Sequence, residues 1–582
     1  MGKKFLLLVC SVFLSVSYIN ADKIINVPCK GDDQIKQLQK ALTEASKYKG
    51  ENITIKLQPT VYKLHRDKAS KQVYHVSNTT SVQENPDPTK HIGIWLKDLN
   101  NLTIDGNGAT ILTHGEMTPM VIDNCNNIRI SNLKIDAADP SVVEIDITKV
   151  GDHYIEFEVL PPTQFEVKEN FFYFKGYGWI FGDEKRISNH TAIAQIYDPV
   201  NDVTLRTDSP IQGYTSAKKI GPQSVKLTFD YQPKVKVGER YQLRHSIRNE
   251  VCMFINLSKN IEIKDVDYHF MGNFGVVSQF TENITMDNIH CEPSEESGRT
   301  NAGFADFLQF SSCKGLITIT NSKFSGSHDD PINIHGTHLQ VVNIDSPNKI
   351  TVAYRHPQTF GFSPCQVGDE IAFVNRETLN YVGKRTKVLS IKSIDDYQYE
   401  IELSDNLKSI VEGEINSKYV IENLTWIPEV KISGNYFSRT PTRAILISTA
   451  GKSLIEKNTF YHIPMASILV ADDANSWYES GPVNDLTIRD NTFEDCKSPV
   501  ILIAPEIKRY NAPVHSNINI IDNKFLSVGS GTIKILATDG ISINNNLFTV
   551  SPSMDISESN LFILNQVNNC KIGFNSIKQI ED

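Results

Sequence analysis

One phrase recurs along the chain: a stretch of alternating apolar and polar residues, then Asn-x-Phe, then a second apolar stretch. Strict alternation predicts half-buried β-strands, and Asn at the fixed turn position suits a left-handed or bent backbone and can form a ladder between copies. The regular copies are VKISGNYF (430–437), SLIEKNTF (453–460), DLTIRDNTF (485–493), INIIDNKF (518–525) and ISINNNLF (541–548). Looser copies are NIRISNLKI (127–135), NIEIKDVDY (260–268), NITMDNIHC (283–291) and LITITNSKF (316–324).

The spacing of these copies predicts stacked coils. Phe437 and Phe460 are 23 residues apart, as are Phe525 and Phe548. The steps on either side of Phe493 are 33 and 32 residues, which indicates a loop of about ten residues added to each coil. A constant period gives a solenoid with one shared interior, whereas a β-propeller would need a longer period and hairpin turns. We therefore predict an all-β protein, a right-handed parallel β-helix of the pectin-lyase-like kind.

Two long gaps interrupt the array. The spacing between Ile135 and Tyr268 is 133 residues, and that between Phe324 and Phe437 is 113. Both gaps contain alternating strands with charged turns, so we expect two small antiparallel β modules inserted into the solenoid. The expected organisation is a signal peptide (1–21), an N-terminal cap with the first coils (22–140), an inserted module (141–250), the central coils (251–341), a second inserted module (342–425) and the C-terminal coils (426–582).

The N-terminal region contains one predicted helix. Residues 32–47 (DDQIKQLQKALTEASK) combine an apolar helical stripe with leading aspartates that would cap it. Such a helix would close the end of the solenoid and cover its open edge.

The first residues, MGKKFLLLVCSVFLSVSYINA, have the composition of an export signal: Lys3 and Lys4, then an apolar run, then Ala21 as a cleavage point. We expect an exported protein, whether secreted, periplasmic or at the cell surface. No later stretch is long and apolar enough for a transmembrane helix. The net charge of −10 and the lack of a Lys/Arg block argue against nucleic acid as a partner. The remaining eight cysteines are scattered and never form CxxC, so they predict neither a zinc site nor a dense disulfide framework.

A repeat also predicts which residues share a column. Asp329 and Asp330 lie five and six residues after Phe324, and the same offset after the next landmark Phe gives Arg443. One coil earlier, allowing for about ten inserted residues, Asp306 falls in this column. Because coils stack at a strand spacing of roughly 4.8 Å, these four side chains are expected to cluster on one wall.

Three acids in one column repel one another, so stability does not explain them. Turn-capping aspartates are the alternative, although this accounts for one Asp more easily than for two adjacent ones. Both Asp329 and Asp330 can reach one site only if the chain bends, for which Pro331 is suited. Clustered carboxyls raise one another's pKa, which lets one act as an acid while another acts as a base, as glycoside hydrolysis requires. The chain has no G-x-S-x-G, H-E-x-x-H or P-loop motif.

The stretch 297–339, SGRTNAGFADFLQFSSCKGLITITNSKFSGSHDDPINIHGTHL, resembles the core motif of glycoside hydrolase family 110. The later RTPTRAILIST (439–449) and ANSWYESGPVNDLTIRDNTF (474–493) are also similar to that family, and the resemblance covers most of the chain. Members are exo-acting, inverting α-1,3-galactosidases, some of which act on blood group B structures. The resemblance therefore implies hydrolysis of terminal α-1,3-linked galactose, with a galactose-terminated glycan as partner. We expect no cofactor, and no metal, because the acids lack the dense oxygen-ligand pattern of a calcium loop.

Residue by residue, the resemblance implies Asp329 as the general acid and Asp306 and Asp330 as the residues that activate water. One departure is Gln309, where the family pattern leads us to expect His.

Further residues are candidates for sugar binding. Arg443 and Trp477 resemble pocket residues, and an exposed Trp in an added loop could stack on a sugar ring. For His335, His338 and Arg299 a structural role and substrate contact both remain open.

Two other functions stay open on sequence grounds. A polygalacturonase-like hydrolase would share the β-helix and the aspartates but should carry a basic cleft for uronate, and no strong basic column is present. A non-catalytic β-helix that only binds glycans is the second.

Overall fold

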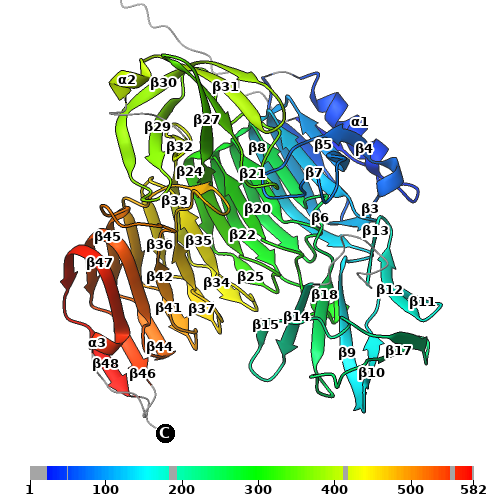
Figure 1. Cartoon of the computed structure of the whole chain (residues 1–582). Coiled ribbons are helices and arrows are strands. Elements are labelled where there is room, and N and C mark those ends of the chain that lie inside the picture. Colours follow the sequence, from blue (N-terminus) through cyan, green and yellow to red (C-terminus); the bar gives the residue numbers. More distant parts are fainter. Residues whose placement is uncertain (1–22, 49, 183–192, 411–416, 551–557, 580–582) are drawn as a thin grey trace, which may run out of the picture.

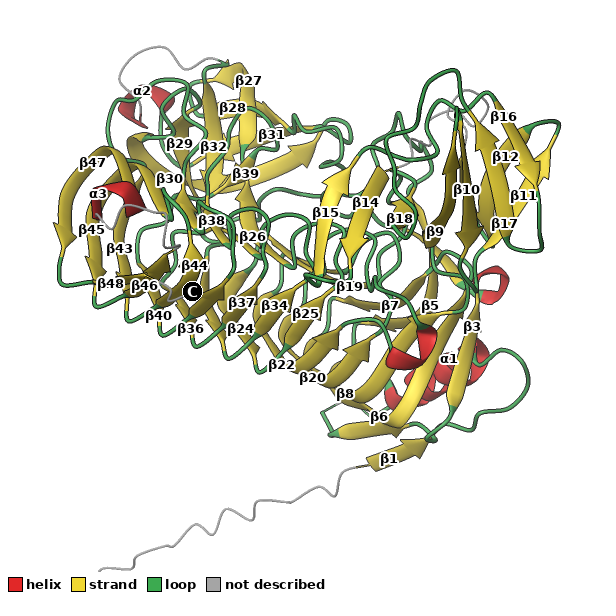
Figure 2. Cartoon of the chain, turned by 90° about the horizontal axis from the view of Figure 1, so that it is seen from below, coloured by secondary structure: helices red, strands yellow, loops and turns green. Residues whose placement is uncertain are grey.

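The computed structural model describes residues 23–48, 50–182, 193–410, 417–550 and 558–579, so the expected signal peptide lies outside the described residues. The chain forms a right-handed parallel β-helix that runs from the helix α1 (Ile35–Ala45) to the last strands near the C-terminus (Figure 1). The predicted fold class is confirmed. Three parallel faces make up each coil, and two inserted β modules rise from one side of the solenoid (Figure 2).

The strands of the solenoid fall into three sets, one for each face, although the longest strands continue from one face onto the next. The short strand Ser70–Val73 pairs antiparallel with its neighbour. The first face contains β1 (Lys23–Asn26), β2 (Ile53–Lys56), β6 (Asn100–His114), β8 (Asn126–Ala137), β20 (Lys259–Tyr268), β22 (Glu282–Cys291), β24 (Lys314–Thr320), β33 (Pro428–Ser433), β36 (Ser453–Glu456), β40 (Leu486–Arg489), β43 (His515–Ile521) and β45 (Ile533–Asn544). The second contains β3 (Val61–His65), β25 (Lys323–Ser325), β34 (Tyr436–Ser438), β37 (Thr459–Tyr461), β41 (Thr492–Glu494), β44 (Lys524–Val528), β46 (Leu547–Val550) and β48 (Ser576–Gln579). The third contains β4 (Ser70–Val73), β5 (Thr89–Lys97), β7 (Thr118–Asp123), β19 (Met253–Asn256), β21 (Val276–Gln279), β23 (Leu308–Ser311), β26 (Ile332–Thr337), β35 (Ile445–Ser448), β38 (Ile468–Val470), β42 (Ile501–Ile503) and β47 (Phe562–Ile572), with β39 (Glu479–Ser480) antiparallel to β26.

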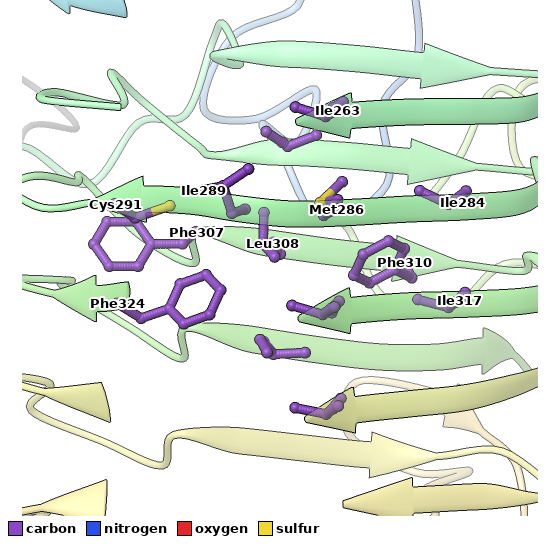
Figure 3. Packing of buried hydrophobic residues seen from close by; sticks show 14 of the residues in the cluster. Ile263, Ile284, Met286, Ile289, Cys291, Phe307, Leu308, Phe310, Ile317 and Phe324 are labelled. Atoms are coloured by element: carbon purple, nitrogen blue, oxygen red, sulfur yellow. The ribbon is translucent and has the colours of Figure 1, made fainter. Parts of the chain in front are cut away.

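The predicted periodicity sets the interior. The alternating apolar residues of each strand point inward and form one continuous core, part of which is seen in Figure 3. The landmark phenylalanines stack directly: the rings of Phe437 and Phe460 lie 4.9 Å apart with 6° between their planes, and those of Phe525 and Phe548 4.7 Å apart with 4°. Losing one such buried ring typically costs about 3–5 kcal/mol, so this stack is a major source of stability.

The Asn two residues before each landmark Phe forms the predicted ladder. Five of them and Asn575, which precedes Ile577, lie on successive coils, and the Nδ2 of each of the first five donates to the Oδ1 of the next at 2.9–3.0 Å; the six are Asn435, Asn458, Asn491, Asn523, Asn546 and Asn575. Of the left-handed or bent backbone expected at these residues, the left-handed conformation is not found. The positive φ falls on the residue before five of the six, for example Lys457 and Asp490. That residue makes the turn, which leaves the ladder Asn free to point inward and bond along the stack.

The first inserted module is an open sheet rather than a barrel. Its seven antiparallel strands are β9 (Val142–Gly151), β10 (Tyr154–Val159), β14 (Ile193–Asp198), β15 (Val203–Thr207), β16 (Ser216–Lys219), β17 (Ser224–Thr228) and β18 (Arg240–Arg244). A three-stranded sheet accompanies it, made of β11 (Gln164–Lys168), β12 (Phe171–Gly176) and β13 (Trp179–Gly182). The module has its own apolar cluster.

The second inserted module is a closed six-stranded barrel with its own core. Its strands are β27 (Leu339–Ser346), β28 (Lys349–Ala353), β29 (Glu370–Asn375), β30 (Tyr381–Ser393), β31 (Gln398–Leu403) and β32 (Tyr419–Asn423). Pairing of Leu339 with Ile421 joins its first and last strands, which returns the chain to the solenoid. Short helical turns complete the described chain: η1 (Arg66–Lys68), η2 (Glu295–Ser297), α2 (Leu407–Ile410) and α3 (Glu558–Leu561).

The helix α1 covers the N-terminal end of the solenoid, as its sequence predicts. Its apolar stripe, including Leu38 and Leu42, is part of the main core. The predicted aspartate cap is wrong: the first residue of the helix is preceded by Gln34, and Asp33 accepts instead from the backbone N–H of His65 (3.1 Å). Asp33 therefore links the helix to a strand.

In the described part of the chain, all eight cysteines are free, and most are buried. Among the same residues, no helix has the length and apolar character needed to cross a membrane.

Candidate active site

The predicted column is present on the third face of the solenoid. The register that pairs β23 with β26, and β26 with β35, puts Asp306, Asp330 and Arg443 at the same place on successive coils. The backbone N–H of Phe307 donates to the Asp330 carbonyl (3.3 Å), which ties the first two positions together. All three residues precede their strands, in the segments that face the inserted modules.

A cavity of about 250 Å³ lies beside this column. Sequence-predicted residues that line it are Asp306, Asp329, Asp330, Arg443 and Trp477, together with Gln309. It is also lined by Asn78, Arg206, Arg248, Phe274, Asn333, Leu446, Ser448, Leu469, Ala471, Asp473, Glu479 and Glu506. Side chains from at least four separate segments of the chain therefore meet here.

Asp306 and Asp330 form the buried side of the cavity, with 7% and 2% of their surfaces exposed. Burial raises the pKa of Asp306 well above its ordinary value, and the neighbouring Asp329 and Asp330 raise it further. Burial also raises the pKa of Asp330, to about 6, with Arg443 acting in the opposite direction. The two carboxyls hold protons more strongly than exposed aspartates, which is the property expected of proton-transfer groups.

Asp329 lies on the more open side, with 27% of its side chain exposed. The predicted bend is present, because residues 328 and 329 form a bend before β26. Consequently Asp329 and Asp330 both line the cavity although they are adjacent in sequence. Asp329 Oδ1 pairs with Arg206 Nη2 at 3.0 Å, and half of the Arg206 side chain is exposed. A pair this open to solvent contributes only about 0–1 kcal/mol and can separate readily.

Arg443 is the direct partner of Asp330. Its Nη2 donates to Asp330 Oδ2 at 2.5 Å, and its backbone N–H donates to Oδ1 at 3.2 Å. Burial alone would lower the pKa of Arg443, but Asp330, Asp329 and Asp306 together raise it above its ordinary value. The guanidinium stays charged and offsets part of the repulsion within the column.

Trp477 stands at the rim of the cavity, 41% exposed. The Asp473 carboxylate holds its loop by accepting from four backbone N–H groups, those of residues 475–478. The indole stacks on the His356 ring of the barrel, with centroids 4.1 Å apart and 27° between the planes. Trp477 therefore combines a fixed position with an accessible ring face.

The predicted histidines lie behind the cavity wall. His335 is 2% exposed, and its Nδ1 bonds to the Gly336 carbonyl while its Nε2 lies 3.5 Å from Glu479 Oε1. His338 is fully buried, with its Nδ1 3.0 Å from the Asp473 carbonyl. Both histidines support cavity residues, and neither lines the cavity.

Arg299, another predicted candidate, lies at a different place in the structure. It pairs with Asp136 (Nη2 to Oδ1, 2.8 Å) and lines a second cavity that shares no residue with the first. The expectation that it contacts substrate has no support from its position, because the SGR loop packs against the first inserted module instead of turning toward the aspartates.

Several cavity residues were not predicted. Arg206 comes from β15 and Arg248 from the end of the same module, and the repeat carries no information about where an insert points its side chains. Glu479 lies inside a stretch that resembles the family but carries no repeat signal of its own. Asn333 could have been found, since it is the outward residue of β26 and is in register with Gln309.

Polar contacts link some of these residues. Asn78 Nδ2 donates to Glu479 Oε1 at 2.7 Å, and Arg248 Nη2 donates to Gln358 Oε1 of the barrel at 2.8 Å. The first insert and an N-terminal loop thus contribute lining residues, and the barrel supports one of them from behind through Gln358. Among the described residues, no group of three or more His, Cys, Asp or Glu is placed to hold a metal ion.

Comparison with known proteins gives the family. The right-handed β-helix region model matches residues 398–548, and the GLAA-B β-barrel domain II model matches residues 349–413. An α-1,3-galactosidase A of Bacteroides thetaiotaomicron is 43% identical over 561 residues, covering 96% of both chains. An α-1,3-galactosidase A of Bacteroides fragilis (strain YCH46) is 34% identical over 94% of this chain and 89% of its own, and an α-1,3-galactosidase B of B. thetaiotaomicron is 32% identical over 93% and 88%. With identity sustained over nearly the whole length, the chain belongs to the α-1,3-galactosidase family, glycoside hydrolase family 110.

Proposed function

We propose that the protein is an exported exo-glycosidase that removes terminal α-1,3-linked galactose, from blood group B-type or linear α-1,3-galactosyl glycans, with inversion at the anomeric carbon. The observation that carries the proposal is the cavity lined by Asp306, Asp329 and Asp330 with Arg443 on the next coil. Its volume of about 250 Å³ suits one terminal sugar unit rather than a run of sugars along a groove. The names of the relatives supply the galactosyl specificity.

The charges around the cavity favour a neutral sugar. Six carboxyl groups line it against three arginines, and two of those arginines are already paired with Asp329 and Asp330. A galacturonate carboxylate would meet a surplus of negative charge. This argues against the polygalacturonase-like alternative.

The burial of the three carboxyls supports the division of roles that the family resemblance implies. In an exo-enzyme the aglycone leaves toward solvent, so the acid that protonates the glycosidic oxygen belongs on the open side, where Asp329 lies. Asp306 and Asp330 are on the buried side and would activate a water molecule there. A base with a pKa of about 6, such as Asp330, is ionised at neutral pH and still binds a proton well.

The inverting outcome rests on the same placement. An inverting glycosidase needs its acid and base roughly 6.5–9.5 Å apart, with a water between base and sugar, whereas a retaining one needs about 5 Å. An acid at the mouth and bases on the buried side, contributed by two coils, favour the wider separation. A double displacement would instead require one of the buried carboxyls to bond to the sugar directly.

The test is hydrolysis of Galα1-3Gal followed by proton NMR before mutarotation. Release of free galactose, first seen as the β anomer, is expected. An initial α signal would contradict the water-activating role of Asp306 and Asp330. Binding without any release would favour the non-catalytic alternative. Export is tested separately, by comparing the N-terminus of the mature protein with the expected cleavage after Ala21.

A further inference from the structure

A second cavity lies at the junction between the solenoid and the first inserted module. Its volume is about 230 Å³, close to that of the candidate active site. The residues that line it are Pro140, Val142, Glu144, Leu160, Pro161, Pro162, Thr163, Arg240, Ser297, Gly298 and Arg299. None of these residues lines the first cavity.

One side of this second cavity is apolar and the other carries a few polar groups. The apolar side consists of three prolines with Val142 and Leu160. On the polar side, Glu144 is 4% exposed, and its Oε1 and Oε2 accept from the N–H and Oγ1 of Thr300 at 2.8 and 2.9 Å. A carboxylate has about four acceptor positions, so Glu144 retains acceptor capacity.

Arg299 provides the complementary donor. Only 8% of its side chain is exposed, its Nη2 bonds to Asp136 (2.8 Å) and to the His269 carbonyl (3.4 Å), and its Nε has no partner among the residues that the structure describes. The Nε is closed off from solvent, so a ligand oxygen in the cavity that Arg299 lines would accept from the accessible Nη1 of the same guanidinium.

The local charges nearly cancel. Arg240 binds Asp146 through two bonds of 2.8 Å and lies 3.8 Å from Glu144, while Arg299 is paired with Asp136. A strongly charged ligand would therefore gain little. A neutral, hydroxyl-rich ligand fits better, because hydroxyls can donate to Glu144 and accept from Arg299.

We propose that this second cavity is a carbohydrate-binding site for one neutral hexose unit, separate from the active site. The apolar C–H face of a pyranose would pack on the proline side, and its hydroxyl edge would meet Glu144 and Arg299, in the way that small-molecule pockets combine apolar walls with a few polar groups. Galactose as the probe rests on the proposed function. Such a site would hold a second branch of a glycan and raise the effective concentration of its ends near the aspartates.

The test uses hydrogen exchange of the full-length D330N variant, which is expected to bind sugar without turnover, in the presence and absence of methyl β-galactoside. Protection is expected in peptides covering 160–163 and 297–300, in addition to those around 329–333. Leu160→Trp fills the second cavity and is expected to abolish the first two signals while keeping the third. The matched control is Ile220→Trp, at an exposed position of the same module, which is expected to change none of them.

Protection confined to 329–333, or protection at 160–163 that survives in L160W, would overturn the second site. Protection there by sulfate but not by galactoside would also overturn it, because the ligand class would be an anion. If L160W melts below the control, Thr163→Leu replaces it as the milder filling variant. Galactose release by the wild-type enzyme is measured independently, so failure of the proposed function leaves a different signature.

Discussion

The C-terminal coils and the central coils are built on one repeat but use their side-chain columns in opposite ways. Along the C-terminal coils, Asn435 to Asn575 bond to one another in a continuous ladder, and each buried amide is satisfied by its own kind. In the central coils, the column that holds Asp306 and Asp330 sets two buried carboxyls on adjacent coils. Arg443, on the third coil, offsets part of their charge.

The difference separates positions chosen for stability from positions chosen for chemistry. A repeated amide adds a hydrogen bond with every coil, because each side chain carries both a donor and an acceptor. A repeated buried carboxyl destabilises the fold, because like charges repel strongly where water is scarce. A column that carries this penalty inside an otherwise self-consistent stack is therefore the candidate functional site.

Neutralising the three acids one at a time tests whether the aspartate column serves catalysis. Asp306→Asn, Asp329→Asn and Asp330→Asn should each lower kcat by about 10²–10⁴-fold, because each removes a proton-transfer group without changing shape. Turnover of Galα1-3Gal measures the effect, with circular dichroism as the check on folding. A variant that retains more than about a tenth of wild-type activity would remove that residue from the mechanism.

The ladder should respond in the reverse sense. Asn491→Ala deletes bonds to Asn458, Asn523 and the Ile455 carbonyl, leaving buried groups unpaired. We expect a loss of about 3 kcal/mol in the free energy of unfolding, with kcat unchanged. Urea denaturation measures it. Asn519→Ala, an outward position on β43, is the matched control and should cost less than about 0.5 kcal/mol.

The burial of Asp306 should make the stability of the protein depend on pH. Because the pKa of Asp306 is raised on folding, the folded state binds its proton more tightly, and its ionisation destabilises the fold as pH rises above the unfolded value near 4. D306N should therefore be more stable than wild type at pH 7, by about 1–4 kcal/mol. The gap should close as pH falls toward 4. Melting curves across this range check it, and a gap independent of pH would contradict the assignment.

Activity should depend on pH through Asp330. Its pKa of about 6 places loss of the base on the acid side, so kcat/KM should fall as pH drops through that value. Removing the Arg443 charge, in Arg443→Met, should move this limb to higher pH, because the guanidinium opposes the rise in the pKa of Asp330. An unmoved limb in the variant would assign the titration to another group.

The smallest expected effect lies at the rim. His356→Ala removes the ring on which Trp477 stacks and should raise KM about 2–10-fold with little change in kcat, the size of an aromatic pair. His290→Ala, a partly exposed position on β22, is the control. A loss confined to kcat would mean that the stack positions the acids rather than the sugar.

The repeat explains why much of the architecture was predictable. Landmark phenylalanines count coils, and counting places Asp330 and Arg443 together across 113 residues. The inserted modules do not follow the repeat, so their sequence does not predict that Arg206 lines the site. Arg299, for which the sequence leaves substrate contact open, lies in the SGR loop, and this loop lines the second cavity instead. The backbone at the turns was also misjudged, because an Asn signal and the positive φ occupy neighbouring residues, as at Lys457 and Asn458.

The barrel between the coils of Asp330 and Arg443 has a consequence for how the protein is made. A ribosome delivers the acid column first and its compensating guanidinium 113 residues later. Closing a flexible loop of that length costs entropy. Here Leu339 pairs with Ile421, which joins the first and last strands of the barrel. Because the barrel has its own core, its folding brings the two ends of the insert together at the solenoid. During synthesis, Arg443 therefore reaches Asp330 only after the first and last strands of the barrel have paired.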